Sequence, residues 1–301
     1  MKKNLVFLCL MILLLSCKND NKKIEVDFKD AVVPVSGPNK NKDTPIYIAI
    51  ASMTSPRETF TYYSQLIKYL SDKLGKTILI KQKKTYEEVN ELLENGEVDF
   101  AFICSGAYVG LSKRKDVNLL VAPVINNRKY YQAYIIARKN SLVQSFKDLK
   151  DKSFAFTDPL SHTGFLYPRK LLKELGTNKG MFFSKTIYTY GHDISIHMVN
   201  RGVIDGASVH GLIYDYIAET HPESVKDIKI IKKSEWFGMP PVVTPKSLDD
   251  KDFKKYKKLF LNIHKDSVGI SILNKLKIEK FVEMDDAIYD NVRKIKKYVE
   301  N

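Results

Sequence analysis

The chain has 301 residues, a length that fits two domains better than three. Apolar residues make up 44% and charged residues 28%, which excludes disorder over most of the chain and allows a core large enough to fold without a metal or disulfide staple. The three cysteines, Cys9, Cys17 and Cys104, form no Cys-x-x-Cys pair, which excludes a thiolate zinc site and a disulfide framework.

The formal net charge is +14, from 49 basic and 35 acidic residues. Nucleic-acid binding would require this charge to gather on one face within a recognisable motif. The lysines are instead spread along the chain, often in pairs such as Lys254–Lys255 and Lys296–Lys297. We therefore interpret them as a solvated surface and predict no nucleic-acid partner, although a positive field would steer an anionic ligand toward the protein.

The first residues resemble a bacterial signal peptide. Lys2 and Lys3 precede the apolar run Leu5–Leu15, whose 11 residues are too few to span a bilayer as a helix. Ser16 and Cys17 follow. A small residue before a cysteine at this place resembles the lipobox of bacterial lipoproteins, in which the cysteine is lipidated and becomes the new N-terminus. An ordinary signal peptide with a chance cysteine is the alternative.

These features predict where the protein resides. We expect a signal peptide over 1–16 and, over 17–44, a lipidated Cys17 followed by a flexible tether, because this polar segment shows little periodicity. The protein should then lie in the cell envelope, held to a membrane by its lipid. It should face the extracytoplasmic side, at the periplasmic face or the cell surface.

From residue 45 onward, strand and helix patterns alternate. Apolar residues at helical spacing predict a helix that Gly75 ends, and the capping box Thr85–Glu88 predicts the start of the next helix. Short runs that are rich in β-branched or apolar residues predict strands at 46–53, 77–82, 98–104 and 118–124.

A second series of strands and helices follows a long strand near 131–138. Its strands are expected at 153–158, 186–190 and 203–209, with further candidates at 227–232 and 242–243. From Leu248 to the end the pattern is helical and rich in lysine. Continuous apolar runs between helices are typical of sheets covered on both faces, so we predict an α/β fold with largely parallel strands.

The most informative segment is Thr157–Gly164, which lies between a predicted strand and a predicted helix. Ser161 and Thr163 offer hydroxyl groups, and Gly164 lets a ligand approach the backbone closely. A helix N-terminus has free N–H groups and the positive end of the helix dipole, so this pattern is typical of an anion site. An ordinary helix cap with a turn proline is the alternative.

Two other strand-to-helix corners support the anion-site interpretation. The segment Tyr190–Asp193 places His192 at the end of the next strand, and Ser105–Tyr108 follows a buried strand of the first series. Open α/β sheets bind ligands at the carboxyl ends of their strands. We therefore expect the three corners to converge on one cleft.

The order of these segments resembles the phosphate/phosphite/phosphonate class of ABC-transporter substrate-binding proteins, often called PhnD-like. The resemblance covers about residues 46–245. It rests on Tyr86, on Tyr108, on the run 147–168 (KDLKDKSFAFTDPLSHTGFLYP), on YGHDISI and NRGVIDGASV, and on the turn Gly238–Pro241.

The resemblance implies a type II periplasmic-binding-protein fold, in which two α/β lobes are joined by a hinge and enclose a ligand cleft. On this fold we place the first lobe at 45–136 plus 243–301 and the second at 137–242. The resemblance also implies that hydroxyl, imidazole and amide groups hold a tetrahedral oxyanion, and the matching residues are Tyr86, Tyr108, Ser161, Thr163 and His192.

Two histidines depart from the family's pattern and are added to the predicted ligand-binding residues. His162 stands where the family usually has threonine. His210 stands where related sequences often have an acidic residue that faces the ligand. An acidic group accepts a proton from a monoprotonated oxyanion, whereas a histidine can donate one. The sequence therefore does not fix the exact ligand, and a fully ionised or differently substituted phosphoryl compound is one alternative.

The sequence thus predicts an extracytoplasmic solute-binding lipoprotein of an ABC importer that binds a small phosphorus oxyanion: phosphonate, phosphite or phosphate. The expected partners are the ligand, the ABC permease with its ATPase, and the membrane that holds the lipid, and the protein is expected to be a monomer. One alternative is a ligand-sensing module of the same fold that signals to a membrane partner. The other is a ferric-ion binder, suggested by the pairs Tyr62–Tyr63 and Tyr130–Tyr131.

We predict no enzymatic activity, no cofactor and no metal. The six histidines show no His-Glu-x-x-His motif or other ligand spacing. Cys104, the cysteine that remains once the signal peptide and the lipidated residue are set aside, lies in an apolar run. It is therefore expected to be a buried, unreactive thiol rather than a nucleophile.

Overall fold

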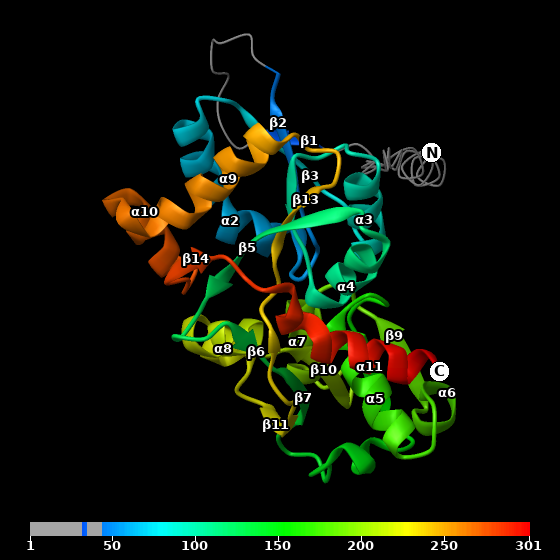
Figure 1. The fold of residues 1–301 in the computed structure, drawn as a ribbon. Helices are drawn as coiled ribbons and strands as arrows, with labels where there is room; N and C mark the ends of the chain where they lie inside the picture. The colour runs from blue at the N-terminus through cyan, green and yellow to red at the C-terminus, as the bar shows by residue number, and fades with distance from the viewer. Residues whose placement is uncertain (1–31, 35–43) are drawn as a thin grey trace, which may run out of the picture.

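The computed structural model describes residues 32–34 and 44–301, which form two lobes, each built on its own β-sheet (Figure 1). The predicted signal peptide, the lipidated Cys17 and most of the predicted tether lie outside the described residues. Within the described part of the chain, no helix combines the length and hydrophobicity needed to cross a membrane.

The first lobe contains a seven-stranded sheet with the order β1-β3-β2-β4-β13-β5-β14. Its strands are β1 (Val32–Pro34), β2 (Ile46–Ile50), β3 (Ile78–Lys81), β4 (Phe100–Phe102), β5 (Val117–Val124), β13 (Val242–Pro245) and β14 (Lys280–Val282). Its helices are α2 (Pro56–Leu74), α3 (Tyr86–Glu94), α4 (Ser105–Arg114), α9 (Asp250–Asn262) and α10 (Ser267–Lys275).

The second lobe contains a five-stranded sheet with the order β11-β7-β10-β8-β9. Its strands are β7 (Ala133–Arg138), β8 (Ser153–Phe156), β9 (Lys185–Tyr188), β10 (Gly206–His210) and β11 (Ile228–Lys233). Its helical segments are the 3₁₀ turns η1 (Phe146–Leu149) and η3 (Pro222–Ser224), the π-helical turn η2 (His162–Leu166), and α5 (Tyr167–Glu174), α6 (Lys179–Phe182), α7 (His192–Asn200) and α8 (Gly211–Thr220).

The prediction of largely parallel sheets is wrong for the strands that connect the lobes. Pairing is parallel between β2 and its neighbours β3 and β4, and between β8 and its neighbours β9 and β10. Strand β13 returns from the second lobe and inserts antiparallel between β4 and β5, and β7 enters from the first lobe and inserts antiparallel between β10 and β11. Local sequence patterns cannot show such insertions, because a buried strand is apolar in either direction.

The chain passes between the lobes along a short two-stranded ribbon. Strands β6 (Tyr130–Tyr131) and β12 (Phe237–Gly238) pair antiparallel, so the outward and return segments run side by side. The C-terminal helix α11 (Asp290–Glu300) packs against α4 of the first lobe and α5 of the second (Figure 1). The lobe boundaries given above stay a prediction, and α11, which falls in 243–301, contacts helices of both lobes.

Several local predictions are confirmed. The Thr85 capping box begins α3, and Gly75 adopts the left-handed conformation that ends α2. The C-terminal segment, however, is not helical throughout, because β14 pairs with β5. The described residues of the predicted tether also include β1, which pairs with β3. Strands of three residues are too short to show an alternating pattern, and this explains why neither was predicted.

Candidate functional site

The strand-to-helix corners of the two lobes meet, as the sequence predicts. The backbone N–H of Tyr86, at the start of α3, donates to the Asp158 carboxylate over 3.0 Å. The N–H of His192, at the start of α7, donates to the Met53 carbonyl over 2.9 Å. The corners follow the carboxyl ends of parallel strands in both sheets, the place where open α/β sheets bind ligands.

A second pair of contacts shows how closely the lobes approach. The N–H of Ser55, which caps α2, donates to the Asp193 carboxylate over 2.9 Å. At the start of α4, a Cβ on Gly106 would lie 2.3 Å from the Leu160 carbonyl oxygen and 2.7 Å from the His162 nitrogen. Glycine is therefore required at position 106 for the first helical turn of α4 to pack against the corner of the second lobe.

A cluster of buried polar side chains lies where these corners meet, and we call it the polar cluster. Its members have side-chain atoms that are shielded from solvent and have no hydrogen-bond partner among the described residues. They are Tyr86 (hydroxyl), His162 (both ring nitrogens), Thr163 (hydroxyl), His192 (Nε2) and His210 (Nδ1). Buried polar groups are normally paired, because each unpaired group costs about 1–3 kcal/mol. Such a concentration therefore marks a place built to bind a polar ligand.

The hydrogen bonds of His192 determine which of its two ring nitrogens is protonated. The backbone N–H of His210 donates to His192 Nδ1 over 3.2 Å, and the Thr157 hydroxyl lies 3.0 Å from the same nitrogen. Because Nδ1 accepts from a backbone amide, the neutral ring carries its proton on Nε2. The Nε2 of His192 is therefore a buried hydrogen-bond donor with no acceptor among the described residues.

All three histidines of the cluster are neutral at ordinary pH. Burial lowers the pKa of His162 to about 3, helped by nearby His210 and Lys170. Burial also lowers the pKa of His210 to about 3, and burial together with His210 holds the pKa of His192 well below its usual range. The cluster thus presents neutral donors and helix N-termini to an anion, which is the chemistry of a desolvated oxyanion site.

Sequence reasoning missed two residues of this site. The ring of Tyr131 stacks on His210 with centroids 4.3 Å apart, and the Tyr131 hydroxyl lies 2.7 Å from that of Ser105. Both residues are fully buried. Ser105 opens a corner that the sequence had identified. Tyr131 lies on β6, the ribbon between the lobes, and its sequence suggested only a ferric-ion ligand through the pair Tyr130–Tyr131.

The other two predicted residues make hydrogen bonds within the protein. The Ser161 hydroxyl accepts from the Gly164 N–H over 3.0 Å and so caps the π-helical turn η2. The Tyr108 hydroxyl donates to Asp286 over 2.6 Å, and Arg293 holds the same carboxylate. The structure therefore brings Tyr86, His162, Thr163, His192 and His210 together at the polar cluster, while Ser161 supports the turn beneath it and Tyr108 points toward α11.

The remaining chemistry of the described residues gives no support to the ferric-ion alternative. Burial raises the pKa of Tyr63 to about 12 and that of Tyr131 well above its usual range, so neither phenol ionises readily. Within residues 32–34 and 44–301 no group of three or more His, Cys, Asp or Glu side chains is arranged to hold a metal ion. Cys104 is a free, buried thiol, and burial raises its pKa, which disfavours the reactive thiolate.

Comparisons with known proteins agree on one family. A family model described as ABC transporter, phosphonate, periplasmic substrate-binding protein matches residues 48–289. The phosphate-import protein PhnD of Mycolicibacterium smegmatis is 31% identical over 163 residues, which cover 51% of this chain and 51% of that protein. The match thus spans about half the length of this relative.

Two solved structures share the fold. A binding protein component of an ABC phosphonate transporter from Pseudomonas aeruginosa superposes with a TM-score of 0.81 at 22% identity, covering 86% of this chain and 87% of that one. PhnD1 from Prochlorococcus marinus, in complex with methylphosphonate, gives a TM-score of 0.77 at 17% identity, covering 85% and 98%. The predicted two-lobed periplasmic-binding-protein fold is confirmed.

Proposed function

Because this chain belongs to the family of periplasmic substrate-binding proteins of phosphonate ABC transporters, we propose that it captures a phosphorus oxyanion outside the cytoplasm and delivers it to an ABC permease with its ATPase. The oxyanion is held between the lobes at the polar cluster, and the protein performs no chemistry on it. The observation that carries the proposal is the set of unpartnered, buried polar atoms contributed by both lobes.

The donors of the polar cluster favour an anion that is fully ionised. His192 Nε2 carries a proton, and the hydroxyl group of Thr163 has no acceptor in the part of the chain that the structure describes. Both oxygens of Asp158 already accept backbone N–H groups, from Tyr86 and Leu160. This carboxylate therefore serves as a backbone acceptor that fixes the corner 157–164 against the start of α3.

A ligand screen tests the proposed function. Thermal unfolding of the full-length protein should be followed with and without methylphosphonate, phosphite, phosphate, sulfate and ferric citrate. A bound ligand at 100 times its Kd stabilises a protein by about 2.7 kcal/mol, which is readily seen as a rise in Tm. We expect this rise with at least one phosphorus oxyanion. Stabilisation by sulfate or ferric citrate, with none by any phosphorus compound, would contradict the proposal.

We also propose that the protein is attached to a membrane through a lipid on Cys17. The support is the apolar run followed by the Ser16–Cys17 pair. Replacing Cys17 by serine should abolish acylation, so the variant should appear in the soluble fraction or keep its uncleaved signal peptide. Mass spectrometry of the mature N-terminus and fractionation of cells measure both. A Cys17→Ser variant that still carries the mass of the lipid and stays attached to the membrane would show that the lipid is not on this residue.

A further inference from the structure

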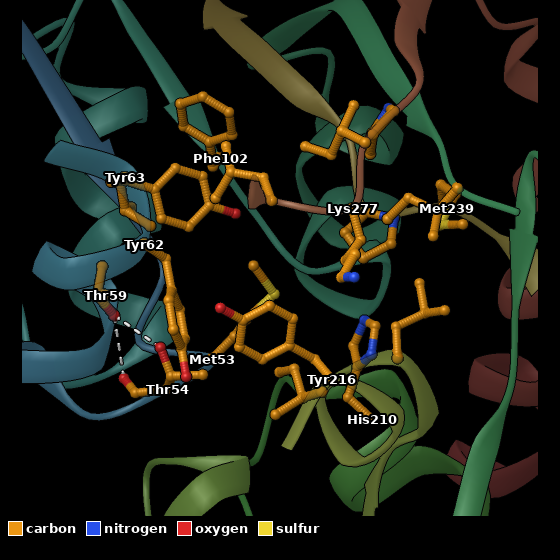
Figure 2. Close-up of a pocket in the computed structure, with 18 of the residues that line it drawn as sticks. Met53, Thr54, Thr59, Tyr62, Tyr63, Phe102, His210, Tyr216, Met239 and Lys277 are labelled. Atoms are coloured by element: carbon orange, nitrogen blue, oxygen red, sulfur yellow. Dashed lines mark hydrogen bonds between the residues drawn. The ribbon is translucent and has the colours of Figure 1, made fainter. Parts of the chain in front are cut away.

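A cavity of about 210 Å³ lies between the lobes next to the polar cluster (Figure 2). The first lobe contributes the segment after β2, the start of α2, β4 and the residues around β14. The second lobe contributes His210 and the first turns of α8, and the return segment contributes Met239–Pro241. The cavity is therefore formed only when the two lobes face each other.

The walls of this cavity are mostly apolar. Phe102 and Tyr63, whose ring centroids lie 5.1 Å apart, line the first-lobe side together with Met53. Ile213 lines the second-lobe side. The rings of Tyr62 and Tyr216 meet edge to face across the lobes at 5.0 Å, and Figure 2 shows both beside the cavity. Walls of this kind bind an apolar ligand group most favourably, because the apolar surfaces of both are removed from water.

The charged groups in the walls are already paired. Lys277 of the first lobe and Glu219 of the second form an ion pair of 2.6 Å across the cavity. Asp215 accepts from the Tyr134 hydroxyl over 3.0 Å. The hydroxyl groups of Thr54 and Thr59 lie 2.9 Å from each other. A ligand group that enters between these walls therefore finds paired charges and a mostly apolar surface.

His210 joins the cavity to the polar cluster. It lines the cavity, its ring stacks on Tyr131, and its ring centroid lies 5.8 Å from that of His192. A phosphoryl group held by the cluster would thus carry its substituent past His210 into the cavity. A methyl group is about the size of a water molecule, which takes about 30 Å³ of liquid volume. It would therefore leave most of the cavity empty.

We infer that the ligand is an organic phosphonate whose substituent is apolar and larger than methyl, such as a butyl or phenyl group. This inference rests on the proposed function, because the phosphoryl group must occupy the polar cluster. Each buried methylene group should tighten binding about fourfold. Butylphosphonate and phenylphosphonate should therefore bind at least about tenfold tighter than methylphosphonate.

Calorimetric titration of the full-length protein tests this inference with phosphate, methylphosphonate, butylphosphonate, phenylphosphonate and 2-aminoethylphosphonate. The Ile213→Phe variant should fill the cavity and abolish the advantage of the larger substituents over methylphosphonate. Ile230→Phe is the matched control, because Ile230 is also partly buried and packs against the same core but does not line the cavity. It should leave the whole series unchanged.

The outcomes separate this inference from the proposed function. Tightest binding of phosphate or methylphosphonate would overturn the inference and leave the proposed function standing. Tightest binding of 2-aminoethylphosphonate would also overturn it, and would point to Asp215 or Glu219 as an ammonium site. Failure of every phosphorus compound would overturn both. The wild-type series decides these outcomes alone, so they do not depend on the folding of either variant.

Discussion

Replacing Thr163 by valine is expected to weaken ligand binding and to stabilise the ligand-free protein at the same time. The Thr163 hydroxyl is fully buried and has no partner within residues 32–34 and 44–301, and valine has nearly the same shape without the hydroxyl. Losing a hydrogen bond to a charged ligand costs about 1.5–3 kcal/mol, which corresponds to roughly ten- to hundredfold in Kd. Removing an unpaired buried hydroxyl should raise the free energy of unfolding by about 1 kcal/mol or more.

Thr244 provides a matched control for this experiment. Its hydroxyl is also fully buried and unpartnered, but it lies on β13 in the first-lobe sheet, away from the polar cluster. Thr244→Val should stabilise the protein in the same way and leave Kd unchanged. Ser161→Ala, which removes the cap of η2, should instead lower stability by about 1 kcal/mol.

Calorimetric titration beside thermal unfolding measures both quantities for each variant. A Thr163→Val protein that binds a confirmed phosphonate as well as wild type does would show that the hydroxyl does not contact the ligand. The polar cluster would then have to bind the anion through its histidines and Tyr86 alone.

The stability of the ligand-free protein is expected to fall steeply as the pH drops below about 6.5. The polar-cluster histidines have a folded-state pKa far below the unfolded value of about 6.5, so the unfolded state binds more protons between pH 6.5 and about 3. Each contributes about 1.4 kcal/mol of lost stability per pH unit in this window, or roughly 4 kcal/mol per unit for the three. Above pH 6.5 the histidines are neutral in both states, so their contribution to the free energy of unfolding no longer changes with pH.

Two carboxyl groups, one buried and one half-buried, act in the opposite direction. Burial raises the pKa of Asp99 and of Asp158. At these two sites the folded state therefore binds protons more readily than the unfolded chain does, and their contribution to stability increases as the pH falls. They offset part of the histidine effect at the acidic end of the window. A saturating phosphonate should make the slope shallower, because a bound anion stabilises a protonated imidazole.

Urea unfolding at several pH values, with and without ligand, measures this slope. His162→Gln is the informative variant, because it removes one of the titrating rings and should reduce the slope by about one third. A ligand-free protein whose stability is constant between pH 7 and pH 5 would mean that these imidazoles are not held neutral in the folded state.

Features that depend on neighbours in the chain were predictable from the amino-acid sequence. The capping box at Thr85 and the glycine that ends α2 follow from backbone hydrogen bonding within a few residues. The corner 157–164 and His192 were found for a related reason. They follow strands and open helical segments, and the ends of parallel strands in a sheet lie along one edge.

The identity of the side chains that complete the site depended on contacts between distant parts of the chain. Tyr131 reaches Ser105 across 26 positions of sequence and stacks on His210 of the other sheet, whereas Tyr108 is turned toward Asp286, 178 positions away. Such pairings arise from the packing of α11 and the β6–β12 ribbon against the lobes. A tyrosine packs equally well in an apolar core and in a polar site, so its residue type and spacing cannot distinguish the two. The antiparallel insertion of β7 and β13 has the same origin, because strand direction within a sheet is set by how the chain crosses between the lobes and leaves no trace in local hydrophobicity.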